Sequence, residues 1–339
     1  MLFYRDGAES DPFGYIFRSP EWLERYDPPR SFPFWLNVEP TNVCNLDCLF
    51  CSRQLSARPL GRLSPTLAEA IFDEAAAHPG AAVRFTGWGE PLLHPEIGRL
   101  AALAKTKGLG LKIYTNGLTL TAELMDLFVE LEVDDLQFSL QGLTPAQYER
   151  NRVGADFARL ESRVALAAER RGRRKRPFLS LLTSALAREL EEADANAFAA
   201  RWLKLVDKVA VDLTNLNFVA GLDRVRPLLG EQSSGLRRGR CVDVFLALEI
   251  KYDGTIQFCG QDSQDRPEHT IGRFGEMSLA QAWRSPRMEA QRELVGRALG
   301  HQASPVCRAC FHNTDKYDFF KKQASLPIGE PAVSAADAS

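Results

Sequence analysis

The sequence predicts an α/β protein: an open, partial (β/α)6 barrel of the TIM type, followed by a small hairpin-plus-helix domain. Short apolar segments alternate with amphipathic helical segments over the first two-thirds of the chain. Six such pairs occur, fewer than the eight of a closed barrel. After residue 235 the alternation stops and a hairpin pattern begins. The predicted parts are an N-terminal extension (1–33), the barrel (34–235), the small domain (236–324) and a disordered tail (325–339).

The barrel elements follow in order. We expect strands at 35–39, 82–86, 111–114, 136–140, 178–183 and 209–213. The first helix between them opens at Ser64, a good N-cap residue before Pro65, and ends near Gly80. Later helices cover about 95–107, a stretch capped by Thr121, the stretch up to Arg171, and about 189–205. Because chemistry in parallel barrels sits where strands end, motifs that follow the strands are the first candidates for a site.

The small domain is predicted from a different pattern. Val244–Ile250 and Thr255–Phe258 are apolar segments joined across Asp253-Gly254, which is a hairpin signal. A helix is expected at about 279–294. The second domain is therefore a hairpin followed by a helix.

Composition narrows the class of function. The chain has 339 residues, a formal net charge of −2 and an ordinary apolar fraction of 45%. Nucleic-acid partners usually require a strong basic excess, which is missing. The N-terminus does not resemble a signal peptide, and no apolar run reaches the length of a membrane span. We therefore expect a cytoplasmic protein without a nucleic-acid or membrane partner.

Seven cysteines carry the main chemical signal. Close spacing of cysteines in a cytosolic chain is more typical of metal ligands than of disulfides. They divide into a group of three and a group of four, which suggests two metal sites: Cys44, Cys48 and Cys51, then Cys241, Cys259, Cys307 and Cys310.

The first group lies on the loop that leaves the first strand. Three thiolates on one loop can bind three irons of a cubic cluster and leave one iron open. The segment from Glu39 through Cys44 to Cys51, with Phe50 before the last cysteine, resembles the signature of the radical S-adenosylmethionine (SAM) superfamily. This resemblance implies a [4Fe-4S] cluster whose open iron binds SAM. It also implies that one electron cleaves SAM to a 5′-deoxyadenosyl radical, which removes a hydrogen atom from an unactivated carbon.

The resemblance also implies a set of SAM contacts. Gly87-Trp88-Gly89-Glu90-Pro91 is similar to the Gly-Gly-Glu-Pro motif that binds the SAM amino group, with Trp88 at a position where only backbone is used. The endings of two later strands, Thr115-Asn116-Gly117 and Ser139-Leu140-Gln141-Gly142, are also similar to strand endings of the family. Arg152 is a candidate for binding the SAM carboxylate. No catalytic acid or base is assigned. The cofactor-binding candidates are Phe50, Gly87, Trp88, Gly89, Glu90, Asn116, Ser139 and Arg152.

The second group resembles the twitch domain, a shortened SPASM extension of radical SAM enzymes. Cys241, Cys259, Cys307 and Cys310 would fully ligate an auxiliary iron–sulfur cluster, of the [4Fe-4S] type. Residues 271–285 also resemble the segment between its cysteine pairs. Such a cluster relays electrons or accepts the electron left after hydrogen abstraction. Structural zinc is the alternative for both groups.

The resemblance implies hydrogen abstraction from a sugar or aminocyclitol carbon of an antibiotic-type intermediate, most simply to dehydrogenate an alcohol. A flavodoxin- or ferredoxin-type protein would be the reductant. The aminocyclitol dehydrogenase type has an arginine before a glycine where this chain reads Phe218-Val219-Ala220-Gly221. Redox-neutral decarboxylation or dehydration of a nucleoside sugar, as in blasticidin-type pathways, therefore stays open. Two further alternatives are modification of a ribosomal peptide and a zinc-stapled interaction protein.

Overall fold

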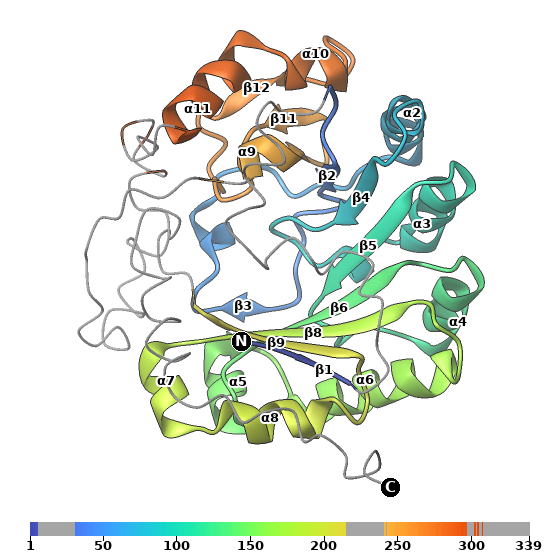
Figure 1. The fold of residues 1–339 in the computed structure, drawn as a ribbon, viewed down its shortest axis with the longest axis vertical. Helices are drawn as coiled ribbons and strands as arrows, with labels where there is room; N and C mark the ends of the chain where they lie inside the picture. Colours follow the sequence, from blue (N-terminus) through green and yellow to red (C-terminus); the bar gives the residue numbers. More distant parts are fainter. Residues whose placement is uncertain are drawn as a thin grey trace, which may run out of the picture.

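The computed structural model describes residues 1–5, 31–214, 241, 243–296, 302, 304 and 307. Within these residues the chain forms a curved ten-stranded sheet with helices along its outer side (Figure 1). The strand order is β1-β9-β8-β6-β5-β4-β2-β10-β11-β12, and β3 and β7 form a separate two-stranded pair. The strands are β1 (Leu2–Tyr4), β2 (Trp35–Val38), β3 (Asp47–Cys48), β4 (Ala82–Phe85), β5 (Gly110–Thr115), β6 (Asp135–Gln141), β7 (Arg152–Val153), β8 (Phe178–Ala185), β9 (Lys208–Leu213), β10 (Ala247–Ile250), β11 (Thr255–Gln257) and β12 (Thr270–Arg273).

The six predicted barrel strands are confirmed. Strands β2, β4, β5, β6, β8 and β9 are parallel neighbours in that order, as expected for an open barrel built from six β–α units. Alternate residues such as Leu36, Val83 and Leu111 are fully buried on the side that packs against the helices. The opposite, inner face carries polar residues, among them Arg84 and Lys112, which are register partners on adjacent strands.

The helices begin largely where the sequence predicts. Ser64 accepts a hydrogen bond from Leu67 N and Thr121 accepts one from Leu124 N, so both are N-caps. The helices are α2 (Pro65–Ala76), α3 (Ile97–Thr106), α4 (Ala122–Glu130), α5 (Pro145–Asn151), α6 (Phe157–Arg171), α7 (Ala187–Glu192), α8 (Ala195–Trp202), α9 (Asp243–Leu246), α10 (Leu279–Trp283) and α11 (Pro286–Gly296). Short 3-10 turns, η2 (Ser52–Leu55) and η3 (Pro91–Leu93), follow the first two barrel strands.

Three element predictions need correction. The expected strand over 244–250 is a helical turn, α9, followed by the shorter β10. The expected helix over 279–294 is divided into α10 and α11, because Pro286 lacks the N–H that would continue the first helix. The expected helix over 189–205 is also divided, into α7 and α8, and the side chain of Asp194 caps the start of the second.

The predicted hairpin is directly hydrogen-bonded to the barrel. Strand β10 pairs in parallel with β2, with Ala247 opposite Trp35 and Ile250 opposite Val38. Strands β11 and β12 then continue the same sheet with antiparallel pairing (Figure 1). The hairpin therefore has a fixed position beside the strand that leads to the three-cysteine loop. No helix in the described part of the chain is long and apolar enough to cross a membrane.

Candidate active site at the carboxyl ends of the barrel strands

The three-cysteine loop is hydrogen-bonded to the C-terminal end of α5 and to β7, which follows it. Cys48 lies in β3 and is the register partner of Arg152 in β7. Leu49 N donates to Asn151 O at 2.9 Å, and Gln54 Nε2 donates to Cys48 O at 2.9 Å. The structure therefore brings Arg152 next to the loop although a hundred residues separate them in the sequence.

The thiols of this loop have surroundings that suit metal ligands. All three cysteines are half-buried. Burial raises the pKa of Cys44 and raises the pKa of Cys51 to about 11, so these thiolates need a positive partner. Within the described residues, no three His, Cys, Asp or Glu side chains are placed to hold a single metal ion. In an iron–sulfur cluster each thiolate binds a different iron, and three thiolates on one loop are the donor set that such a cluster with one open iron requires.

Glu90 is a buried carboxylate that ties two strand ends together. Its Oε1 accepts from Leu92 N at 3.0 Å and from Thr115 Oγ1 at 2.6 Å, and its Oε2 accepts from Asn116 N at 2.6 Å. Burial raises the pKa of Glu90, although these donors act in the opposite direction. The side chain of Glu90 thus fixes the loop after β4 to the loop after β5.

The two glycines of the Gly87–Pro91 segment leave no room for a side chain. A Cβ on Gly89 would lie 2.1 Å from Thr41 O and 2.7 Å from Val43 O. Gly87 has a φ of 124°, and a Cβ there would lie 2.7 Å from Glu39 Cγ. Trp88 N donates to Glu39 Oε1 at 3.2 Å. The segment therefore lies directly on the residues that lead to Cys44.

Two predicted SAM contacts differ in their surroundings. Asn116 donates through Nδ2 to Asn45 Oδ1 at 2.9 Å, so it anchors the three-cysteine loop directly. Arg152 is buried, and its Nε has no hydrogen-bond partner in the structure. A buried guanidinium N–H without a partner is costly, and a ligand carboxylate would satisfy it. Phe50 is buried within the loop and Ser139 is half-buried on β6.

Of the second cysteine group, Cys241, Cys259 and Cys307 are half-buried, and Cys310 lies outside the described residues. Cys307 is surrounded by hydrogen-bonding groups: its N–H donates to Ser304 Oγ at 3.1 Å and Gln291 Nε2 donates to its Sγ at 3.6 Å. These polar contacts suit a thiolate ligand.

A buried histidine that the sequence did not single out contacts Cys307. His269 is fully buried, with Nδ1 3.2 Å from Asp262 Oδ2 and Nε2 2.7 Å from Ser304 Oγ. Burial alone would lower the pKa of His269, but Asp262 and Cys307 together raise it to about 9. Burial would raise the pKa of Cys307, whereas the contact with His269 lowers it overall. No spacing of His269 relative to the cysteines predicts this contact.

Two family models match this chain. The family model described as the radical SAM superfamily matches residues 38–183, and SPASM, an iron–sulfur cluster-binding domain, matches residues 241–311. The tungsten-containing aldehyde ferredoxin oxidoreductase cofactor-modifying protein of Pyrococcus furiosus is 36% identical over 114 residues, 33% of this chain and 32% of that protein. The PqqA peptide cyclase of Ruegeria pomeroyi is 33% identical over 142 residues, 42% of this chain and 37% of that protein.

The matched segment thus spans about a third of the length of these curated relatives. Among solved structures, BtrN in complex with AdoMet and 2-DOIA has a TM-score of 0.54 at 17% identity, covering 81% of this chain and 92% of that one. This likeness supports the partial-barrel fold with a small C-terminal domain.

Proposed function

Because this chain belongs to the radical SAM superfamily and carries a C-terminal SPASM domain, we propose that it is an enzyme that removes a hydrogen atom from a sugar or aminocyclitol carbon and dehydrogenates an alcohol there. SAM and the first cluster, when bound, supply one-electron cleavage and hydrogen-atom abstraction. The auxiliary cluster is the proposed acceptor of the second electron.

In this proposal each group of residues has a binding role. Cys44, Cys48 and Cys51 hold the first cluster, and the backbone of Gly87–Glu90 binds the SAM amino group. Arg152 pairs with the SAM carboxylate, which would satisfy its unpartnered Nε. Asn116 keeps the three-cysteine loop in place through Asn45. In the second domain, the ligands of the auxiliary cluster are Cys241, Cys259, Cys307 and Cys310.

The observation that carries the substrate class is the polar inner face of the barrel. Glu249, Asn37, Arg84, Lys112 and Asp135 occupy one register row across five neighbouring strands. Asn37 hydrogen-bonds to Glu249, and Lys112 Nζ lies 2.7 Å from Asp135 Oδ2. Two buried atoms of this row, Asn37 Oδ1 and Arg84 Nε, have no hydrogen-bond partner in the structure. A small molecule rich in hydroxyl and amino groups would pair with them, whereas an apolar substrate would leave them unpaired.

The test is turnover by the anaerobically reconstituted protein with SAM, dithionite and a panel of aminocyclitols, aminoglycosides and sugar nucleosides. Mass spectrometry follows 5′-deoxyadenosine and the mass of each candidate. Substrate-dependent 5′-deoxyadenosine with loss of two hydrogens is the expected result. Loss of carbon dioxide or water instead would replace dehydrogenation by redox-neutral elimination. The Cys44→Ala variant is the control, because it removes one ligand of the first cluster while leaving the second group intact.

A second candidate is modification of a ribosomal peptide, favoured by the match to the PqqA peptide cyclase. Incubation with a precursor-peptide panel tests it, and a mass change on a peptide with none on the small molecules would overturn the sugar assignment. Iron and sulfide analysis tests the zinc alternative, since zinc without sulfide would contradict radical chemistry. A cytoplasmic location and a flavodoxin- or ferredoxin-type reductant belong to the same proposal, and replacing dithionite by a flavodoxin system tests the latter.

A further inference from the structure

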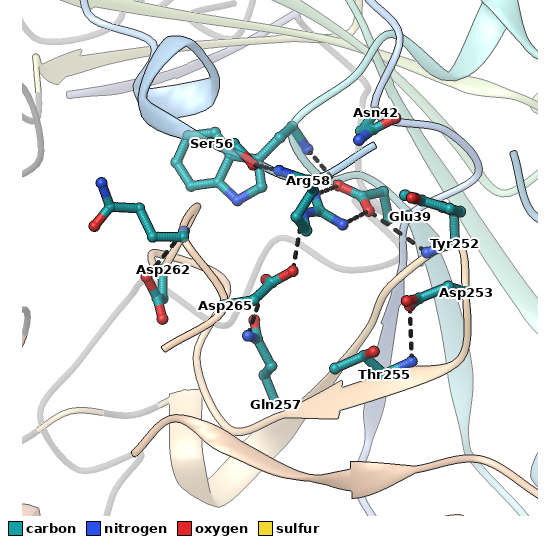
Figure 2. Close-up of polar contacts among 12 residues, drawn as sticks. Glu39, Asn42, Ser56, Arg58, Tyr252, Asp253, Thr255, Gln257, Asp262 and Asp265 are labelled. Carbon is teal, nitrogen blue, oxygen red and sulfur yellow. Dashed lines mark hydrogen bonds and ion pairs between the residues drawn. The ribbon is translucent and has the colours of Figure 1, made fainter. Parts of the chain in front are cut away.

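A buried ion-pair network connects the predicted SAM-binding segment with the loop that follows Cys259. Its centre is Arg58, whose side chain is 10% exposed. Arg58 Nη1 and Nη2 donate to the two carboxylate oxygens of Glu39 at 2.7 and 2.8 Å, and its Nε lies 3.0 Å from Asp265 Oδ2 (Figure 2). One guanidinium therefore binds two carboxylates from parts of the chain more than two hundred residues apart.

The Glu39 arm leads to the first site. Glu39 is the residue directly after β2, and its Oε1 also accepts from Trp88 N at 3.2 Å. Because a Cβ on Gly87 would touch Glu39 Cγ, the carboxylate lies directly against the Gly87–Glu90 segment. Arg58 therefore fixes a side chain on which this segment rests.

The Asp265 arm leads to the second site. Asp265 lies six residues after Cys259, has a left-handed φ of 50° and accepts from Gln257 Nε2 at 3.0 Å (Figure 2). In the same loop, Asp262 accepts from Arg266 N at 2.7 Å and pairs with His269, which faces Ser304 and Cys307. The loop is thus anchored to the barrel by one carboxylate and to the Cys307 region by the other.

The segment that carries Arg58 is itself held on both sides. Asn42 Nδ2 donates to Pro59 O at 2.8 Å from the barrel side, and Tyr252 Oη donates to the same carbonyl at 2.7 Å from the β10–β11 turn. Gly61 N donates to Asn42 Oδ1 at 2.8 Å, and a Cβ on Gly61 would clash with the Tyr252 ring. The guanidinium is therefore rigidly placed between the two regions.

Burial makes the Arg58–Glu39 ion pair costly to break. Glu39 is 2% exposed, and although burial opposes it, the contacts with Arg58 and the nearby Lys251 keep the pKa of Glu39 below its usual value. Removing one member of a buried ion pair leaves an uncompensated charge, which is more costly than a surface pair is worth. Such networks hold one geometry in preference to others.

We propose that Arg58 is a positioning residue that clamps the Cys259–His269 loop onto the Gly87–Glu90 segment. It thereby sets the separation between the SAM-binding end of the barrel and the auxiliary cluster. The clamp is a property of the protein fold, and only its consequence for electron transfer rests on the proposed function. A change in one arm is therefore transmitted to the other arm.

The test is amide hydrogen exchange on the protein without SAM, in the Asp265→Asn variant. This change breaks the Arg58–Asp265 ion pair but keeps the Arg58–Glu39 pair intact. We expect exchange to rise about tenfold in the peptides covering both 260–268 and 87–90. A rise confined to 260–268 would mean a purely local role for Asp265 and would overturn the proposal. Arg201→Met, which removes an exposed pair with Glu161, is the matched control and leaves both peptides unchanged.

A second variant and a second readout keep the proposal testable if Asp265→Asn folds poorly. Arg58→Lys retains the charge but not the fork that reaches two carboxylates, so it should loosen both peptides less than Arg58→Met. In the reconstituted protein, the distance between the two reduced clusters is followed by the dipolar broadening of their paramagnetic resonance signals. Altered broadening in Asp265→Asn supports the clamp, and unchanged broadening contradicts it whatever the substrate proves to be.

Discussion

The Gly89→Ala substitution tests how closely the predicted SAM-binding segment depends on its contact with the residues before Cys44. The added Cβ would lie 2.1 Å from Thr41 O and 2.7 Å from Val43 O, which are backbone atoms that cannot rotate away. The distance between the Cβ and Thr41 O must therefore increase to about 3.0 Å. A shift of that size also stretches the 2.8 Å hydrogen bond from Glu90 N to Val43 O beyond hydrogen-bonding distance. Overpacking costs about 1–3 kcal/mol and the lost hydrogen bond about 1 kcal/mol.

We therefore expect Gly89→Ala to lower the free energy of unfolding by roughly 2–4 kcal/mol and to weaken SAM binding. Chemical denaturation of the cluster-free protein measures the first effect, and equilibrium dialysis of SAM with the reconstituted protein measures the second. The control is Gly98→Ala in α3, where the Cβ meets the ends of two flexible side chains, Leu127 at 2.6 Å and Leu124 at 3.8 Å. There the better helix propensity of alanine, about 1 kcal/mol, offsets the contact. Equal stability of the two variants would refute the reasoning.

Three further predictions follow from buried groups near the site. Glu90→Gln replaces a carboxylate that accepts three hydrogen bonds. The free energy of unfolding, measured by urea denaturation, should therefore fall by about 1.5–3 kcal/mol. The control Glu96→Gln, at a surface position, should change it by less than about 0.5 kcal/mol. Gly61→Ala should destabilise the protein by about 1–3 kcal/mol because its Cβ would lie 2.1 Å from the Tyr252 ring, and Tyr252→Ala in the same chain should relieve most of that loss; no relief would locate the strain elsewhere. The folded state lowers the pKa of Glu39, so the stabilising effect of its carboxylate is present above the ordinary value of 4.5 and is lost as the pH falls. In denaturation series, the difference in unfolding free energy between wild type and Glu39→Gln should therefore narrow below about pH 4.5. A difference that stays constant with pH would contradict this.

The barrel could be predicted from the sequence because its signals are local. Apolar runs define the six strands, and Ser64 and Thr121 mark helix starts through caps that lie three residues from their partners. The cysteine loop and the Gly87–Pro91 segment were recognisable for the same reason, since each is a short motif. The roles of the named residues toward the cluster and SAM stay predictions, and the structure adds a contact of Asn116 with the cysteine loop.

The rest depends on pairings that no local pattern encodes. Arg58 lies in an irregular segment, and its partner Asp265 is brought near it by the pairing of β10 with β2, far along the chain. His269 faces Cys307 across 38 residues without any ligand spacing. The divided helices were mispredicted because a single Pro286 or Asp194 outweighed an otherwise continuous helical pattern.

The pairing of β10 with β2 also decides whether the barrel could exist alone. A chain cut before Ala247 would leave Trp35–Val38 as an edge strand with a row of unpaired N–H and C=O groups beside buried apolar side chains. Such an edge recruits strands from other molecules and promotes aggregation. In the full sheet the described margins are the short strands β1 and β12 instead. A small C-terminal domain transferred from a relative would therefore have to reproduce the pairing of β10 with β2 to leave the barrel without an exposed edge.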